Sequence, residues 1–200
     1  MKTKLGIVGC GFLGNIVADA WKNGLLPEYE LVGVTSRTRS SAEATAAKTG
    51  CAVCDTVDAL LALEPEYIVE AASVEAVRAM ALPVLRRGVN LVILSIGAFA
   101  DLTFYEQVQQ AAREGSAKEA IATFPRRVNV AVATSLATTG PEITGVTMHS
   151  VPNWVGDDHR ITAEIEGVKA VVDICSSTSA IAGWSAVSLL RNLSSPVCFY

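Results

Sequence analysis

A glycine-rich segment near the start of the chain constrains the fold most strongly: residues 9–14 read Gly-Cys-Gly-Phe-Leu-Gly, with the spacing GxGxxG. An apolar run from Lys4 to Val8 predicts a strand directly before this segment, and a helical pattern follows it as far as Gly24. In such a unit the first glycine permits a sharp turn, the second lets the backbone approach a pyrophosphate, and the third allows close packing of helix on strand. The first helical turn offers free N–H groups to phosphates. We therefore predict dinucleotide binding at Gly9, Gly11, Phe12, Leu13 and Gly14.

The same alternation of strand and helix recurs along the first half of the chain. Further strands are predicted at residues 30–35, 52–54, 67–71 and 90–95, and helices at 42–48, 57–63, 75–87 and 102–113. Pro83 should kink the helix over 75–87 or divide it into two, because proline lacks a backbone donor, and Asp101 should cap the helix that follows. Repeated βα units indicate an α/β fold, a Rossmann doubly wound parallel sheet.

The pattern changes after Pro141, which predicts a second, smaller α+β domain. Its expected elements are strands at 145–150, 160–166 and 168–175, a helix over 180–193 and a terminal strand near Val197. Ser116 and Glu119 have the spacing of a capping box for a short helix. We assign residues 1–114 to the dinucleotide-binding domain and 115–200 to a substrate and dimerisation domain, whose terminal segment can pack back on the first.

The end of the second strand bears on the choice of cofactor. An acidic residue there would bind the ribose hydroxyl of NAD, but residues 35–39 read Thr-Ser-Arg-Thr-Arg and contain no carboxylate. Ser36 and Arg37 suit a 2′-phosphate, so NADP is favoured over NAD; if Arg37 and Arg39 are only solvated charges, both cofactors are used. Contacts to the nicotinamide half are expected at the ends of later strands. These candidates are Ala72, Ser73, Gly97 and Ala98.

Composition excludes several classes of function. A net charge of −4 gives no general attraction to nucleic acid or anionic membranes, and the apolar runs are too short to span a bilayer. No cleavage pattern of a signal peptide is present, so we expect a cytoplasmic protein with reduced thiols. Cys51 and Cys54 form a CxxC, but no second pair or nearby histidine completes a metal site, and a short buried strand is the favoured interpretation.

Several longer segments resemble the L-aspartate dehydrogenase family. They are residues 69–73 (Val-Glu-Ala-Ala-Ser), 94–98 (Leu-Ser-Ile-Gly-Ala), 115–120 (Gly-Ser-Ala-Lys-Glu-Ala), 124–130 (Phe-Pro-Arg-Arg-Val-Asn-Val) and 190–197 (Leu-Arg-Asn-Leu-Ser-Ser-Pro-Val). The resemblance implies a homodimeric enzyme that oxidises L-aspartate with NAD or NADP to iminosuccinate, which feeds NAD biosynthesis or hydrolyses to oxaloacetate and ammonia. It also implies a catalytic role for His159, seven residues after Pro152, and a cofactor contact at Asn129. Asp157 or Asp158 is a candidate to orient His159, whereas His149 receives no role.

The chain departs from this family at several positions. Several tens of residues that should carry substrate contacts are absent between Glu114 and Gly115, Val151 replaces an aspartate, and Gly156-Asp157 replaces an Arg-Asn pair. Two alternatives therefore stay open. The chain can be a truncated relative that binds the cofactor without catalysis, or a dehydrogenase that acts on another amino acid or a sugar.

Overall fold

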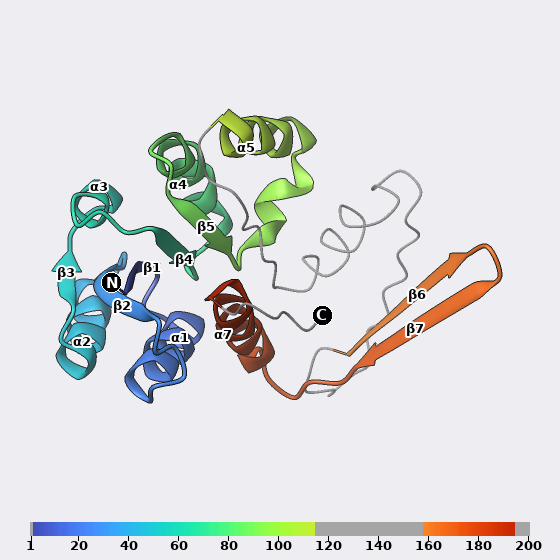
Figure 1. The fold of residues 1–200 in the computed structure, drawn as a ribbon, viewed down its shortest axis with the longest axis horizontal. Coiled ribbons are helices and arrows are strands. Elements are labelled where there is room, and N and C mark those ends of the chain that lie inside the picture. Colours follow the sequence, from blue (N-terminus) through green and yellow to red (C-terminus); the bar gives the residue numbers. More distant parts are fainter. Residues whose placement is uncertain (1, 115–157, 195–200) are drawn as a thin grey trace.

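The computed structural model describes residues 2–114 and 158–194, and its main feature is a five-stranded parallel sheet with the order β3-β2-β1-β4-β5 (Figure 1). The strands are β1 (Thr3–Val8), β2 (Tyr29–Thr35), β3 (Ala52–Cys54), β4 (Tyr67–Glu70) and β5 (Asn90–Ile93). The predicted Rossmann sheet is confirmed, and each strand lies within two residues of its predicted bounds. All carboxyl ends share one edge, hereafter the carboxyl edge, because the pairs are parallel.

Helices connect these strands. They are α1 (Phe12–Lys22), α2 (Arg39–Thr49), α3 (Val57–Leu61), α4 (Val74–Arg86) and α5 (Leu102–Glu114), and a 3-10 helix, η1 (Ile96–Ala100), precedes α5. The sequence missed η1. As predicted, Asp101 caps α5, since its Oδ1 accepts a hydrogen bond from the backbone N–H of Phe104 at 3.1 Å.

Pro83 does not divide α4, so the alternative of two shorter helices is wrong. Proline removes one backbone hydrogen bond, but it lies in the last turn, where few bonds depend on it. The helix also buries a continuous apolar face against the sheet, which includes Val77, Met80, Ala81, Val84 and Leu85. Burial of these side chains outweighs the loss of one backbone bond.

Each face of the sheet buries a separate apolar core. The first core packs β4 and β5 against α3, α4 and α5, and includes Leu60, Ile68, Met80, Phe99 and Val108. The second packs the other face against α1, α2 and a C-terminal helix, α7 (Ala180–Ser194). In Figure 1, α4 and α5 lie on one side of the sheet, whereas α1, α2 and α7 lie on the other.

Helix α7 returns from the C-terminal part of the chain to pack on α1. A Cβ on Gly183 would lie 2.8 Å from the Cβ of Ile16, so the two helices meet where one has no side chain. Further along α7, the hydroxyl of Tyr29 donates a 2.9 Å hydrogen bond to the carbonyl oxygen of Leu190. Ile16 lies early in α1 and Tyr29 begins β2, so α7 runs from the carboxyl edge toward the opposite edge.

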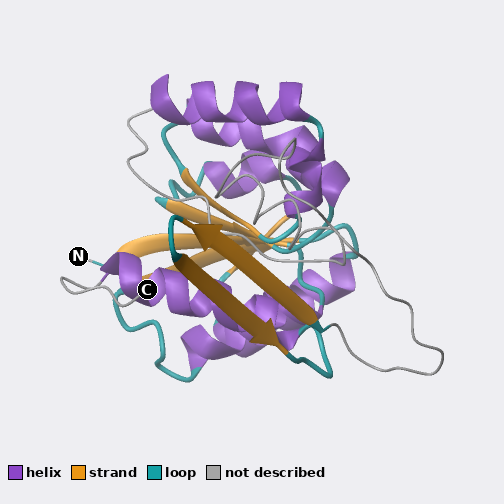
Figure 2. Cartoon of the chain, turned by 90° about the vertical axis from the view of Figure 1, so that its right-hand side faces the viewer, coloured by secondary structure: helices purple, strands orange, loops and turns teal. Residues whose placement is uncertain are grey.

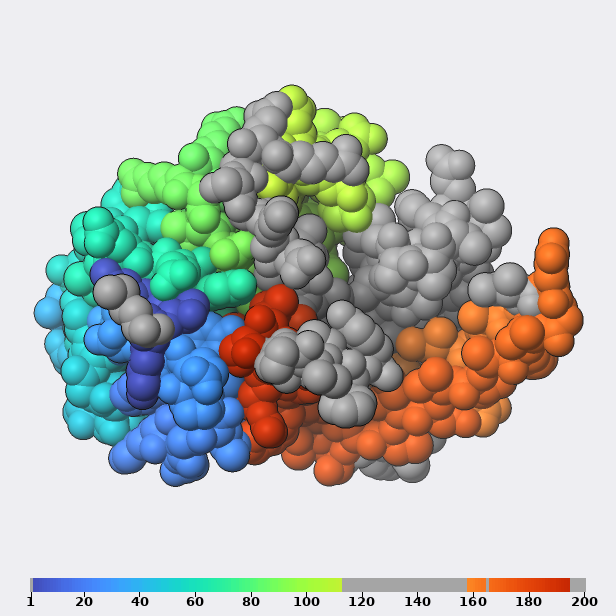
Figure 3. Space-filling view, viewed as in Figure 1, coloured from blue at the N-terminus to red at the C-terminus, as the bar shows by residue number. Residues whose placement is uncertain are grey.

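Strands β6 (His159–Ile165) and β7 (Val168–Ile174) form an antiparallel hairpin that joins α7 through residues 175–179. These predicted strands are confirmed with a shift of one residue. Alternation places Ile161 and Val172 on an apolar face, while the other face carries ion pairs between Arg160 and Asp173 (2.6 Å) and between Lys169 and Glu164 (2.9 Å). The hairpin extends beyond α7 in Figures 1 and 3, and Figure 2 shows it in front of the five-stranded sheet.

Three predicted features lie outside the described residues: the strand over 145–150, the capping box of Ser116 and Glu119, and the strand near Val197. The domain division between residues 114 and 115 stays a prediction. The short strand β3 is confirmed at residues 52–54, but only Cys54 at its end is buried, whereas Ala52 is exposed. Within residues 2–114 and 158–194, no helix combines the length and the hydropathy that crossing a membrane requires.

The packing of α7 on the sheet leads to a stability prediction. Leu190 is fully buried in the second core, so Leu190→Ala should lower the free energy of unfolding by about 2–5 kcal/mol. Ile181 on the same helix is 47% exposed, and Ile181→Ala should cost less than about 1 kcal/mol. Urea denaturation of both variants measures the difference. Equal, small losses would mean that α7 does not stabilise the sheet.

Candidate cofactor site at the carboxyl edge

The glycine loop between β1 and α1 has the geometry that its sequence predicted. Gly9 has a φ of +98°, and a Cβ there would lie 2.6 Å from the carbonyl carbon of Ala71. A Cβ on Gly14 would lie 1.8 Å from the carbonyl oxygen of Gly9, so only glycine lets α1 begin this close to the strand. A Cβ on Gly11 would meet nothing within 4 Å. Gly9 and Gly14 therefore shape the loop, while Gly11 leaves open space above it.

The first turn of α1 suits an anion. Gly11 is the N-cap and provides no side-chain cap, and the first turn contains no acidic residue. The N–H groups of this turn have no partner within the helix and carry the positive end of the helix dipole. Phe12 is 60% exposed and Leu13 is half-buried beside them. This end of the helix can hold the pyrophosphate of a dinucleotide.

Asn15 fixes the glycine loop, a role that the sequence analysis missed. Its Nδ2 donates to the carbonyl oxygens of Cys10 at 3.0 Å and Gly11 at 2.9 Å. Its Oδ1 accepts a 3.2 Å hydrogen bond from the hydroxyl of Thr45, which is buried in α2. The side chain therefore binds two carbonyl oxygens of the loop and connects the loop to α2.

The segment after β2 contains two arginines that the sequence could not distinguish but that differ in their contacts. Arg39 bonds Glu43 at 2.8 Å and also pairs with Asp55. Arg37 is exposed and has no hydrogen bond or ion pair to any residue in the described ranges, and Ser36 beside it is half-buried. Arg39 is thus committed to protein contacts, whereas Arg37 makes no hydrogen bond within the described ranges and only helps to lower the pKa of Glu75 through its charge.

The segments after β4 and β5 hold the other predicted contacts. The Ser73 hydroxyl caps α4 by accepting from the N–H of Ala76 at 3.2 Å, and Ala72 is exposed. Gly97 is half-buried, whereas Ala98 is fully buried and donates its N–H to the carbonyl of Ser95 at 3.2 Å. The methyl group of Ala98 therefore packs into the core, and neighbouring residues such as Gly97 form the accessible surface of this segment.

Glu70 is an unpredicted feature of this edge, although the motif that contains it was noted. It ends β4 with a fully buried side chain, between Val8 of β1 and Ile93 of β5. Its Oε1 accepts hydrogen bonds from the N–H groups of Ala72 (2.7 Å) and Ser73 (2.9 Å) and from the Ser95 hydroxyl (2.9 Å), and its Oε2 accepts from the Ser95 N–H (3.0 Å). Burial raises the pKa of Glu70, and the four donors oppose this effect.

The predicted catalytic residue His159 lies at the base of the hairpin. It begins β6, pairs with Ile174 of β7 and is half-buried. The hairpin joins α7 at the end that faces the carboxyl edge. His159 therefore lies toward the carboxyl edge, as the glycine loop does, and not toward the opposite edge. Asp158 accepts a 3.2 Å hydrogen bond from the N–H of Ser176, so it closes the hairpin base. Asp157 and Asn129 lie outside the described residues.

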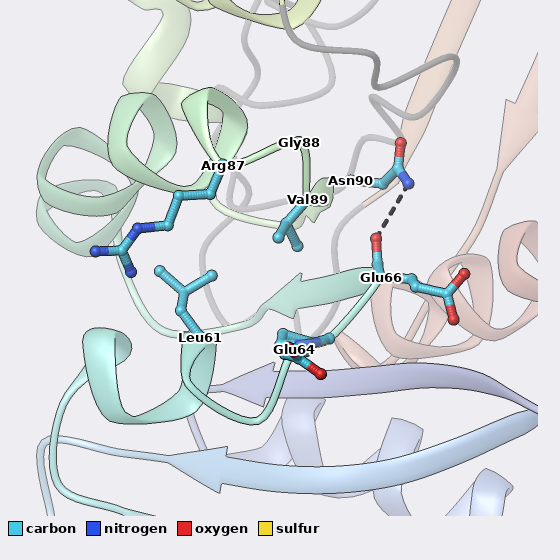
Figure 4. Close-up of a pocket in the computed structure, with 8 residues that line it drawn as sticks. Leu61, Glu64, Glu66, Arg87, Gly88, Val89 and Asn90 are labelled. Carbon is cyan, nitrogen blue, oxygen red and sulfur yellow. Dashed lines mark hydrogen bonds between the residues drawn. The ribbon is translucent and has the colours of Figure 1, made fainter.

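A hollow lies at the opposite edge, where β4 and β5 begin (Figure 4). Its lining includes Glu66, Arg87 and Asn90, and Asn90 donates to the carbonyl oxygen of Glu66 at 3.0 Å. Arg87 also pairs with Asp58 at 3.0 Å. The hollow is distant from the glycine loop along the strands, and ligands of open α/β sheets bind at the carboxyl ends of the strands. We therefore place the cofactor at the carboxyl edge.

The glycine geometry predicts different outcomes at two positions. Gly11→Ala should keep the free energy of unfolding within about 1 kcal/mol of wild type, because the new methyl group meets open space, but weaken dinucleotide affinity about tenfold or more. Gly14→Ala should cost about 1–3 kcal/mol of stability as well, because it meets backbone. Denaturation and calorimetric titration with NADP and NAD test both variants. Unchanged affinity in Gly11→Ala would place the pyrophosphate elsewhere.

Two family models match the chain. Residues 9–121 match the NAD-binding domain of homoserine dehydrogenase, and residues 105–193 match the C-terminal domain of aspartate dehydrogenase. Curated relatives include the L-aspartate dehydrogenases of Methanococcus maripaludis (25% identical) and Methanocaldococcus jannaschii (24% identical), each covering 97% of this chain and 98% of the relative. The crystal structure of aspartate dehydrogenase from Thermotoga maritima superimposes with a TM-score of 0.69 at 17% identity and covers all of both chains.

The lengths of these alignments bear on the predicted missing segment. The alignment with the Methanococcus relative spans 265 positions, although this chain has 200 residues, so at least 65 positions face no residue of this chain. The chain therefore has the beginning and the end of its relatives but lacks internal sequence. From its matched domains, the chain belongs to the family of NAD-binding domains of the homoserine dehydrogenase type, and the similarity of residues 105–193 indicates an aspartate dehydrogenase-like, NAD(P)-dependent oxidoreductase.

Proposed function

We propose that the protein is an L-aspartate dehydrogenase that oxidises L-aspartate to iminosuccinate. The match of residues 105–193 to the aspartate dehydrogenase C-terminal domain carries this proposal, because that part of the chain supplies the substrate side. The glycine loop and the open first turn of α1 support the cofactor side. Iminosuccinate then either enters NAD biosynthesis or adds water and releases ammonia to give oxaloacetate.

The reaction breaks the Cα–H bond of aspartate and converts its amine to an imine. The bound nicotinamide supplies the acceptor for the hydride that leaves Cα. The amino nitrogen must lose a proton for the C=N bond to form, and the imidazole of His159 is the group that we assign to this transfer. Its half-buried place at the hairpin base, on the glycine-loop side, supports the assignment.

For the cofactor we propose NADP, with NAD as the weaker alternative. The exposed guanidinium of Arg37 can form charge-assisted, bidentate hydrogen bonds to a 2′-phosphate, and the hydroxyl of Ser36 adds a donor. Plain NAD would leave these donors without a ligand partner. The remaining cofactor contacts that we propose are Ala72, Ser73, Gly97, Ala98 through its backbone, and Asn129.

We further propose that the enzyme acts in the cytoplasm as a homodimer formed by residues 115–200. The apolar face of the hairpin supports self-association: Val168 is 66% exposed and Val172 is 50% exposed. Contiguous apolar surface of this kind is typical of interaction sites.

The missing internal sequence favours one specific alternative. If the absent positions carried the contacts to the substrate carboxylates, the chain would bind the dinucleotide without turnover. The carboxyl edge would still be intact, because the elements that form it lie in residues 2–114. Affinity for the cofactor would then be the function of the protein.

Aspartate-dependent formation of NADPH, followed at the absorbance band of the reduced nicotinamide, distinguishes these two functions. The dehydrogenase should turn over with L-aspartate, and His159→Ala should lower kcat about 100-fold or more while NADP binds as in wild type. Thr162→Ala, on the opposite face of the same strand, is the matched control and should keep full activity. Cofactor binding without turnover on L-aspartate would establish the non-catalytic alternative, and full activity of His159→Ala would remove its catalytic role.

The two arginines after β2 provide a matched test of cofactor preference. Arg37→Ala should weaken NADP about ten- to hundredfold through loss of a charged hydrogen-bonding group, and change NAD affinity less than about threefold. Arg39→Ala should leave both affinities near wild type, since Arg39 is bonded to Glu43 and Asp55. Titration calorimetry with each cofactor measures these values. An equal effect of Arg37→Ala on NAD and NADP would contradict the 2′-phosphate assignment.

A further inference from the structure

Glu70 places a buried carboxylate beneath the carboxyl edge, and no cation of the described residues pairs with it. Every polar contact of its two oxygens is a donor: three backbone N–H groups and one hydroxyl. Burial raises the pKa of Glu70, but a carboxylate whose polar contacts are all donors is stabilised in its charged form, and these bonds oppose the effect of burial. Among residues 2–114 and 158–194, the negative charge of Glu70 is therefore compensated by dipoles alone.

The hydrogen bonds of Glu70 join two segments that surround the site. Ala72 and Ser73 follow β4, and Ser95 follows β5. The segment after β4 also supports the glycine loop, because a Cβ on Gly9 would lie 2.6–2.8 Å from atoms of Ala71 and Ala72. One carboxylate thus fixes the backbone that lies between the glycine loop and η1.

The topology indicates which half of the cofactor lies over this charge. The sheet order puts β2, with Ser36 and Arg37 at its end, on one side of β1, and β4 and β5 on the other. A dinucleotide whose pyrophosphate lies on the glycine loop and whose adenosine reaches the end of β2 extends its nicotinamide toward β4 and β5. The nicotinamide is therefore the half of the cofactor nearest to Glu70.

We propose that Glu70 is a positioning residue whose buried charge also makes the site prefer the oxidised cofactor over the reduced one. The oxidised nicotinamide ring carries a positive charge and the reduced ring is neutral, so a nearby carboxylate attracts only the oxidised form. This inference rests on the proposed binding of NADP at the carboxyl edge. The preference also lowers the tendency of the bound cofactor to accept a hydride, which the site must offset elsewhere.

The experiment measures the dissociation constants of NADP and NADPH for wild type, Glu70→Gln, Glu70→Asp and Ser95→Ala. Glu70→Gln removes the charge at nearly constant volume and should raise the ratio of the NADP constant to the NADPH constant on the order of tenfold or more, because the lost charge attracts only the oxidised ring. Glu70→Asp shortens the side chain and Ser95→Ala removes a donor, but both keep the charge. They should weaken both cofactor forms and keep the ratio within about twofold of wild type.

Each result decides the proposal. An unchanged ratio in Glu70→Gln overturns it, because a purely structural role moves both constants together. A tenfold change of the ratio in Glu70→Asp or Ser95→Ala also overturns it, and this test remains if Glu70→Gln does not fold. If wild type binds neither form, NADP binding itself fails; if wild type binds both and only the ratio disagrees, the failure belongs to Glu70 alone.

Discussion

The close contact between the carbonyl oxygen of Gly9 and the Cα of Gly14 is the constraint on which the geometry of the carboxyl edge depends. A single methyl group at residue 14 would lie 1.8 Å from that oxygen, so helix α1 can begin beside β1 only with glycine there. The same loop packs closely against the segment after β4, so Gly9 has no room for a side chain. Close packing of three backbone segments therefore fixes the first turn of α1 so that its N–H groups face the place where we propose that a pyrophosphate binds.

Polar side chains under the surface hold this arrangement in place. Asn15 binds two loop carbonyls and reaches Thr45 of α2, while Glu70 binds the segments after β4 and β5. The two residues act on opposite sides of β1, Asn15 toward the end where we propose the adenosine and Glu70 toward the end where we propose the nicotinamide. A buried polar group costs free energy unless its hydrogen bonds are satisfied, and the buried Glu70 meets this condition. Asn15 is half-buried, and both atoms of its amide have partners.

Much of the fold followed from local pattern, and the misses have physical reasons. Short apolar runs separated by helical periods predicted all five parallel strands within two residues, because parallel strands buried on both faces are uniformly apolar. The expected strand over 90–95 ends at Ile93 because the chain turns into η1, where Ser95 bonds Glu70. Pro83 predicted a kink or a break, but the buried face of α4 keeps one helix. Ala98 was predicted to contact the cofactor from its position after a strand, and the structure adds that its side chain is fully buried.

By itself, the sequence determined the Rossmann sheet, the glycine loop and the absence of a carboxylate after β2, because each depends on residue type at fixed local spacing. Only the tertiary structure distinguished Arg37 from Arg39, since Asp55, one of the partners of Arg39, begins a different βα connection. It also decided that α7 completes the second core through Leu190, and that Glu70 is buried between two segments separated by more than twenty residues. These features depend on contacts between distant parts of the chain, which neither composition nor periodicity encodes.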